Sequence, residues 1–135
     1  MISPERNINI VIADSSPEFM EGLDVLFSGE PQYKILRTFT CGLELLNSGN
    51  LAKANVILLD MGLNKKNGLE ISRQINLKYP DLPLIALCMH HDKLYIREII
   101  ACGFKGFIYI PMVVDCLFDV IDKVLNNEFD FSKHL

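Results

Sequence analysis

Short apolar runs alternate along the chain with segments in which apolar residues recur at helical spacing. The runs are expected to be strands buried on both faces, because nearly every position in them is apolar. They cover residues 8–13, 33–39, 55–59, 84–87 and 107–110. The segments that follow them predict helices over residues 17–27, 42–46, 68–79, 93–101 and 113–125.

Residues that start and stop helices stand at the ends of these segments. Ser16 is expected to cap the first helix, with Pro17 in its first position, and Asp92 to cap the fourth. Pro80 and Gly103 are expected to end the third and fourth helices. Strand and helix thus repeat five times with short loops, which predicts an α/β domain whose parallel sheet carries helices on both faces. We expect one domain over residues 1–126 and a polar tail over residues 127–135 that frays.

Composition and charge narrow this picture. Half of the 135 residues are hydrophobic and 22% are charged, which is enough for a core and excludes a disordered chain. No apolar stretch has the length of a membrane span and the first residues do not resemble a secretory signal, so no membrane association is expected. The net charge of -4 argues against nucleic-acid binding by this domain itself. The four cysteines form no CxxC pair, which favours reduced thiols and a cytoplasmic location.

Polar side chains follow three of the predicted strands directly. Asp14 follows the first, Asp60 the third and Cys88 the fourth. Because the carboxyl ends of parallel strands lie at one edge of the sheet, Asp14 and Asp60 come close together if the first and third strands are neighbours. Two carboxylates repel each other unless a proton or a cation intervenes, and Mg²⁺ accepts oxygen ligands of this kind. Each aspartate alone is also typical of an ordinary loop or cap residue.

Four parts of the chain together resemble the receiver domain of two-component response regulators. Residues 11–17 (VIADSSP) are similar to its first strand–helix unit, and residues 56–61 (VILLDM) with 67–70 (NGLE) to its phosphoacceptor segment. Residues 79–87 (YPDLPLIAL) and 103–108 (GFKGFI) are similar to the runs into its fourth and fifth strands. The resemblance extends over about residues 7–126. Pro17 and Gly22 look most like the NarL/FixJ-like subfamily, which carries a helix-turn-helix output domain.

This resemblance implies a flavodoxin-like (βα)5 fold, doubly wound, with a parallel five-stranded sheet in the order 2-1-3-4-5. It implies a phosphorylation switch and not an enzyme, with at most weak self-phosphotransfer or autodephosphorylation. A histidine kinase or another phosphodonor would pass a phosphoryl group to Asp60, and Mg²⁺ would be bound by Asp14, Asp60 and the backbone carbonyl of Gly62. Phe107 matches an aromatic switch position, and the signal would leave through the face of the fourth helix, fifth strand and fifth helix.

Three positions depart from the receiver pattern. Ser15 stands where a second metal-binding acid is expected, Cys88 where a phosphate-binding hydroxyl is expected, and Ile110 where a lysine is expected. A thiol is a weak hydrogen-bond donor and isoleucine carries no charge. The resemblance therefore implies a degenerate site, with fewer partners for a phosphoryl group and weak Mg²⁺ binding.

These departures leave two functions open. The domain is a receiver phosphorylated at Asp60, or it is a pseudo-receiver that binds partners without phosphorylation. Lys65, Lys66 and Lys105 are candidates to supply the missing positive charge, although lysines in loops are usually just solvated. A third alternative, a small flavodoxin-like flavin binder, is disfavoured because the loop after the first strand carries Asp14, which would repel a phosphate group.

The helix predicted over Val113–Leu125 is unusually apolar. One stripe of its residues is expected to face the core: Val114, Leu117, Phe118, Ile121 and Leu125. An adjoining stripe widens the apolar surface: Val113, Cys116, Val120 and Val124. An exposed remainder would be a contact surface for a homodimer or another protein partner. DNA binding by the whole protein would lie in an output domain outside this chain, because no basic helix-turn-helix segment is present in it.

Overall fold

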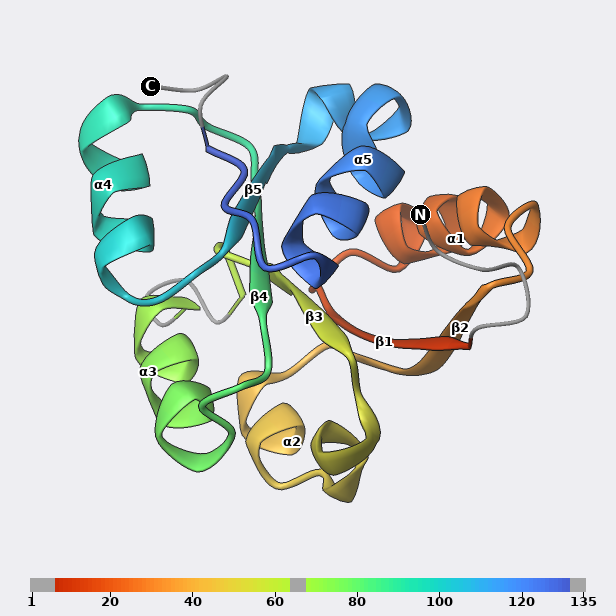
Figure 1. Cartoon of the computed structure of the whole chain (residues 1–135), viewed down its shortest axis with the longest axis horizontal. Coiled ribbons are helices and arrows are strands. Elements are labelled where there is room, and N and C mark those ends of the chain that lie inside the picture. The colour runs from red at the N-terminus through yellow and green to blue at the C-terminus, as the bar shows by residue number, and fades with distance from the viewer. Residues whose placement is uncertain (1–6, 64–67, 132–135) are drawn as a thin grey trace.

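The five apolar runs form one parallel sheet, whose strand order is β2-β1-β3-β4-β5. The computed structural model describes residues 7–63 and 68–131 (Figure 1). Its strands are β1 (Ile8–Ala13), β2 (Tyr33–Phe39), β3 (Val56–Asp60), β4 (Leu84–Cys88) and β5 (Gly106–Tyr109). The predicted fold class and strand order are confirmed.

Five α-helices connect and cover the strands. They are α1 (Pro17–Ser28), α2 (Gly42–Leu46), α3 (Gly68–Lys78), α4 (Lys93–Ala101) and α5 (Val113–Leu125). The predicted caps of α1 and α4 are confirmed, since the Ser16 and Asp92 side chains accept hydrogen bonds from the Phe19 and Leu94 backbone N–H groups. The sequence did not predict the short 3-10 helix Gly49–Lys53, whose first turn is capped by the Ser48 side chain.

The last strand ends one residue earlier than predicted. Ile110 begins a 3-10 turn, Ile110–Met112, and is not part of β5. Pro111 explains this difference, because proline has no N–H with which to continue a sheet ladder. The start of β5 also moves, to Gly106, which pairs with Ile85 of β4.

The two faces of the sheet each bury an apolar cluster. Helices α2, α3 and α4 cover one face and helices α1 and α5 the other, as Figure 1 shows. On the α1/α5 face, the Phe27, Tyr33 and Phe118 rings pack together with centroids 5.3–5.6 Å apart. The Tyr33 hydroxyl donates a 2.8 Å hydrogen bond to Asp122 of α5. This contact joins the second strand to the last helix.

Gly106 allows α5 to pack closely on β5. A Cβ atom at this position would lie 2.9 Å from methyl carbons of Val120 and Val124. We expect Gly106→Ala to lower the free energy of unfolding by about 1–2 kcal/mol, because a well-packed core must shift to admit the methyl group. Urea unfolding measures this change. Gly22→Ala in α1 is the control: it meets nothing within 4 Å, so it should leave stability unchanged or raise it. Equal losses in both variants would contradict the packing argument.

The first residues of the tail pack against the domain, so the expectation that the tail frays is wrong up to residue 131. Asp130 and Phe131 are each 4% exposed. The Asp130 N–H donates a 3.0 Å hydrogen bond to the Lys105 carbonyl, and Asp130 forms a parallel bridge with Gly106 at the start of β5. We call residues 127–131 the C-terminal strap.

Candidate functional site

The two aspartates predicted to meet lie at the ends of neighbouring strands. Ala13 at the end of β1 pairs with Leu59 of β3, and Asp14 and Asp60 are the next residues of each strand. The Asp14 N–H donates to the Phe39 carbonyl at 2.9 Å, and the N–H of Met61, just after Asp60, donates to Leu87 at 2.9 Å. Hydrogen bonds from both sides of the sheet therefore fix the backbone on which this acidic pair stands.

Each carboxylate also accepts a hydrogen bond from its own loop. The Ser16 N–H donates to Asp14 Oδ1 at 2.7 Å, and the Gly62 N–H donates to Asp60 Oδ1 at 3.0 Å. Both bonds form Asx turns, in which an aspartate side chain accepts a hydrogen bond from the backbone N–H two residues further along the chain. They hold both side chains at the carboxyl edge of the sheet.

Burial raises the pKa of both acids. The pKa of Asp14, a residue that is 3% exposed, rises from 3.8 to about 6. Desolvation is the main cause; the Ser16 hydrogen bond opposes it, and the negative charge of Asp60 adds to it. Desolvation likewise raises the pKa of Asp60, while the backbone N–H groups of Gly62 and Ser15 lower it. The hydrogen bonds from the backbone therefore do not fully offset the cost of burying the two negative charges.

A pocket of about 650 Å³ opens in front of Asp60. Its lining contains no lysine or arginine among the residues that the structure describes: Asp60, Met61, Gly62, Cys88, Met89, His90, Asp92 and Tyr95. Burial raises the pKa of the Cys88 thiol, so the protonated thiol, a weak donor, faces this space. The pocket offers the carboxylates of Asp60 and Asp92, of which Asp92 caps α4, and otherwise mainly apolar or weakly polar partners.

The remaining predicted site residues are divided between the pocket and the core. Ser15 is exposed and follows Asp14 at the carboxyl edge. Ile110, at the position where a lysine was expected, packs against the apolar cluster on the α1/α5 face. Phe107 is fully buried in the cluster on the other face, together with residues of α3 and α4. The structure thus brings Ser15, Cys88, Asp14 and Asp60 to one edge, and leaves Ile110 and Phe107 as packing residues beside it.

Lys105 is not available to this pocket. It precedes β5, and its amino group lies over the Phe129 ring at 4.6 Å from the centroid, at the amino end of the strand. Asp60 and the pocket lie at the carboxyl end of the sheet, so Lys105 cannot replace the missing lysine. Lys65 and Lys66, the other two candidates, lie outside the residues that the structure describes.

Sequence reasoning missed two aromatic residues near the site. The Tyr109 ring, at the end of β5, meets the His91 ring edge-on at a centroid distance of 4.5 Å. Tyr95 of α4 lines the pocket in front of Asp60. In the sequence, Tyr109 stands at the end of the last strand and Tyr95 in the first turn of the fourth helix. Core residues occupy such positions too, so the positions alone did not identify these two residues.

The acidic pair fits a divalent cation in part. Mg²⁺ is commonly held by one or two carboxylates and several water molecules, which matches Asp14, Asp60 and the Gly62 carbonyl. Within residues 7–63 and 68–131, however, no group of three or more His, Cys, Asp or Glu side chains is arranged to hold a metal. Within these residues the acidic pair is therefore not joined by a third such ligand, and the residue after Asp14 is the neutral Ser15.

Helix α5 buries most of its apolar surface. Leu117, Val120, Ile121 and Val124 are buried against the sheet, whereas Val114 is 71% exposed. Val114 belongs to the stripe expected to face the core, so that expectation is wrong at this position, whereas Val120 and Val124 of the adjoining stripe are buried. Val114 lies at the amino end of α5, next to the half-exposed Met112.

The fold and the acidic pair together define a flavodoxin-like domain with its site at the carboxyl edge of a doubly wound sheet. Residues 10–122 match the family model described as the response regulator receiver domain, so the chain belongs to this family and is the receiver domain of a two-component response regulator. Domains of this family are signalling switches, not classical enzymes. No helix within residues 7–63 or 68–131 has the length and apolarity needed to cross a membrane.

Known proteins similar to the chain are transcriptional regulators. The chain is 28% identical over 120 residues to the transcriptional regulatory protein DegU of Brevibacillus brevis, which covers 89% of this chain and 51% of that protein. The chain spans about half the length of the curated relatives it matches. The predicted resemblance to the subfamily with an output domain is therefore confirmed.

Solved structures show the same fold at lower identity. A LuxR-family response regulator from Aurantimonas sp. SI85-9A1 superposes with a TM-score of 0.85 at 18% identity, covering 93% of this chain and 90% of that one. The isolated receiver domain of RcsB from Salmonella enterica serovar Typhimurium, solved with the phosphomimetic BeF3-, gives 0.83 at 20% identity, over 96% of this chain and 99% of that one. These likenesses support the fold alone.

Proposed function

We propose that Asp60 is the phosphoacceptor of this receiver domain and that a histidine kinase or another phosphodonor supplies the phosphoryl group. A carboxylate oxygen of Asp60 attacks phosphorus, the bond from phosphorus to the donor breaks, and the donor group leaves with the bonding electron pair. The domain acts as a switch, with at most weak phosphotransfer activity of its own. The whole protein is proposed to be a cytoplasmic transcription regulator whose DNA-binding output domain lies outside this chain.

The acidic pair carries this proposal. Asp14 and Asp60 stand at adjacent strand ends, each fixed by a hydrogen bond from its own loop. Burying two acids whose pKa values are raised lowers the stability of the folded domain at neutral pH. Acids with such perturbed pKa values are found most often at functional sites. Asp60 is also the member of the pair that faces a pocket large enough for a phosphoryl donor.

Asp14, Asp60 and the Gly62 carbonyl are the residues that would hold Mg²⁺. When bound, Mg²⁺ would offset the negative charge that phosphoryl transfer concentrates at this edge. The Gly62 N–H already orients Asp60, with 3.0 Å between nitrogen and Oδ1. Because Ser15 stands where the resemblance places a further acid, we expect weak Mg²⁺ binding.

The output is proposed to leave through the face of α4, β5 and α5. Phe107 is buried on β5 at the aromatic switch position. Exposed apolar residues at the amino ends of α4 and α5, Leu94 and Val114, offer surface for a homodimer or another protein.

One observation favours the second candidate, a pseudo-receiver that binds partners without phosphorylation. The described lining of the pocket carries no lysine or arginine, and Ile110 packs toward α1 and α5 instead of the pocket. Few side chains of the pocket would therefore bind phosphorylated Asp60 more strongly than the unmodified carboxylate. In that case the domain would bind its partners in the unmodified state.

Intact mass spectrometry after incubation with acetyl phosphate and Mg²⁺ separates the two candidates. We expect a gain of about 80 Da, one phosphoryl group, in the unsubstituted domain and none in Asp60→Asn. Asp24→Asn is the matched control, because it removes one acidic charge from the exposed side of α1, outside the pocket lining, and it should still gain the mass. No gain in the unsubstituted domain, under conditions in which another receiver reacts, would favour the pseudo-receiver.

A further inference from the structure

The two edges of the sheet are protected in different ways. The outer edge of β2 carries the exposed charged residues Lys34 and Arg37, a common defence against pairing with another strand. The apolar strand β5 has Phe107 and Ile108 fully buried, and the start of its outer edge, at Gly106, is bridged instead by Asp130 of the C-terminal strap. In the view of Figure 1 the strap runs back along β5 between α4 and α5. The strap therefore covers part of the face through which we propose that the signal leaves.

Contacts at both ends of the strap hold it to the domain. The Glu128 N–H donates to the Lys123 carbonyl of α5 at 2.9 Å, and the Asp130 N–H donates to the Lys105 carbonyl at 3.0 Å. Lys123 also approaches the Asp130 carboxylate, with 3.9 Å between Nζ and Oδ2. The strap is thus held by two backbone hydrogen bonds and one long ion pair, and Phe129 in its middle stays exposed.

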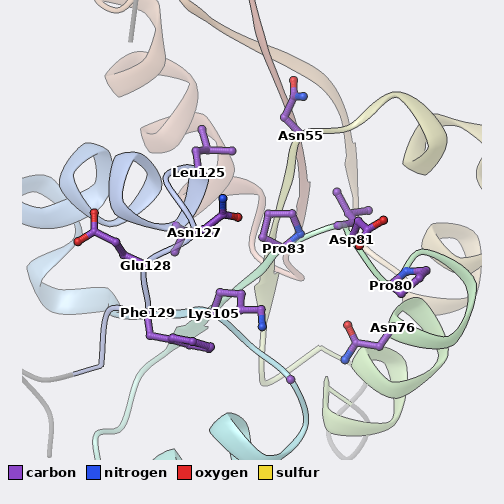
Figure 2. A pocket seen from close by; sticks show the side chains of 13 residues that line it. Asn55, Asn76, Pro80, Asp81, Pro83, Lys105, Leu125, Asn127, Glu128 and Phe129 are labelled. Carbon is purple, nitrogen blue, oxygen red and sulfur yellow. The ribbon is translucent and has the colours of Figure 1, made fainter. Parts of the chain in front are cut away.

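The middle of the strap remains open to solvent. Figure 2 shows Asn127, Glu128 and Phe129 along one side of a pocket of about 590 Å³, with Asn76 and Pro80 on the opposite side. Phe129 is 63% exposed. Asp130 and Phe131 are the buried residues of the strap, so its attachment depends mainly on the end that reaches β5.

The register of the strap places Phe131 beside the switch position. Asp130 bridges Gly106 in parallel, so Phe131 and Phe107 are the next residues of the two segments. Side chains of paired neighbours in parallel segments point to the same face of a sheet. In agreement, both rings belong to the buried cluster on the α3/α4 face. Movement of the Phe107 ring would thus change the packing of Phe131.

We propose that Phe131 is a positioning residue that holds Phe107 in its buried state, and that the strap leaves the β5 edge when Asp60 is phosphorylated. This inference rests on the proposed function. Loss of the Phe107–Phe131 packing removes the main buried attachment of the strap, and the solvent-exposed middle does not retain it. Release then exposes the edge of β5 at Gly106, where Asp130 is bridged in the structure.

Hydrogen exchange in the unsubstituted protein tests the release. Exchange in a peptide covering residues 127–131 is measured with and without acetyl phosphate and Mg²⁺, alongside intact mass. We expect exchange there to become at least tenfold faster on phosphorylation, and not in Asp60→Asn. A gain in mass with unchanged exchange of the strap would overturn the inference and leave the proposed function standing.

Tryptophan fluorescence gives a second readout, because the chain contains no tryptophan. In Phe131→Trp the indole should be shielded from acrylamide, and its quenching should increase several-fold on phosphorylation. Phe129→Trp is the matched control in the same strap: its indole should be quenched strongly in both states. Equal quenching of the two variants before phosphorylation would contradict the buried position of residue 131.

A third comparison tests the packing without phosphorylation. Phe107→Leu should speed exchange of the strap at least tenfold, whereas Phe39→Leu, in the same cluster but on β2, should not. Equal effects of the two variants would mean that the strap responds only to global stability and would overturn the positioning role. If no phosphoryl group is incorporated, the proposed function and the release fail together, and this comparison still decides whether Phe131 depends on Phe107.

Discussion

Asp14→Asn is expected to raise the free energy of unfolding at pH 8 by up to about 3 kcal/mol. The pKa of Asp14 rises from 3.8 to about 6 in the folded protein, which corresponds to about that free energy. Because the folded state holds the proton more tightly than the unfolded state, the stability of the unsubstituted domain falls as the pH rises from about 4 to about 6. The loss of stability is complete at pH values above the pKa of Asp14 in the folded protein, and it is absent at pH values below its pKa in the unfolded chain. An asparagine pays no such penalty, and its side-chain oxygen still accepts the Ser16 hydrogen bond.

Urea unfolding between pH 4 and pH 8, in EDTA, checks this prediction. The difference between Asp14→Asn and the unsubstituted domain should vanish near pH 4 and reach its full size near pH 8. Asp81→Asn, an exposed aspartate at the opposite edge of the sheet, is the control and should change stability little at any pH. A difference for Asp14→Asn that does not depend on pH would show that titration of this carboxyl is not the cause.

Ser15→Asp is expected to tighten Mg²⁺ binding at least tenfold. The substitution adds an acid beside Asp14 at the position where the resemblance places a further acid. An added unit charge near a divalent ion contributes several kcal/mol at an effective dielectric constant of about 20, and part of this is lost to repulsion among the acids. A tenfold gain requires a net of only about 1.4 kcal/mol.

Thermal unfolding over a range of Mg²⁺ concentrations measures this binding without any phosphoryl transfer. Ser15→Asp should melt at a lower temperature than the unsubstituted domain in EDTA and gain more stability on addition of Mg²⁺. Ser16→Asp adds the same charge one residue later, where the side chain caps α1 and is directed to the Phe19 N–H. It should not increase the response to Mg²⁺. Equal responses of the two variants would mean that net charge, and not a ligand at position 15, attracts the ion.

The fold was predictable from the sequence because its two main signals are local. Apolar runs and helix caps such as Ser16 and Asp92 predicted the strands and helices, and most of their ends match the prediction while the others differ by one residue. The sequence did not predict the strap, since Asp130 and Phe131 lie in a polar tail with no periodic pattern. Their burial depends on a long-range contact with Lys105 and Gly106 that no local pattern encodes.

The candidate site was predictable in its residues but not in its surroundings. The positions of Asp14 and Asp60 follow from strand order and register. Sequence spacing cannot tell which way a side chain points once its strand has ended. Ile110 turns toward the α1/α5 cluster because Pro111 starts a new turn there, and Lys105 lies at the amino end of β5, far along the strand from the carboxyl edge.

The bond between Tyr33 and Asp122 joins residues that are 89 positions apart. While a ribosome is making the chain, β1, α1 and β2 emerge first, and Phe27 and Tyr33 then have no Phe118 against which to pack. The α1/α5 face of the sheet therefore closes only after nearly the whole domain has been synthesised. Until then a nascent chain displays aromatic side chains to chaperones, and a transcript truncated before α5 would yield a product that is prone to aggregation and proteolysis.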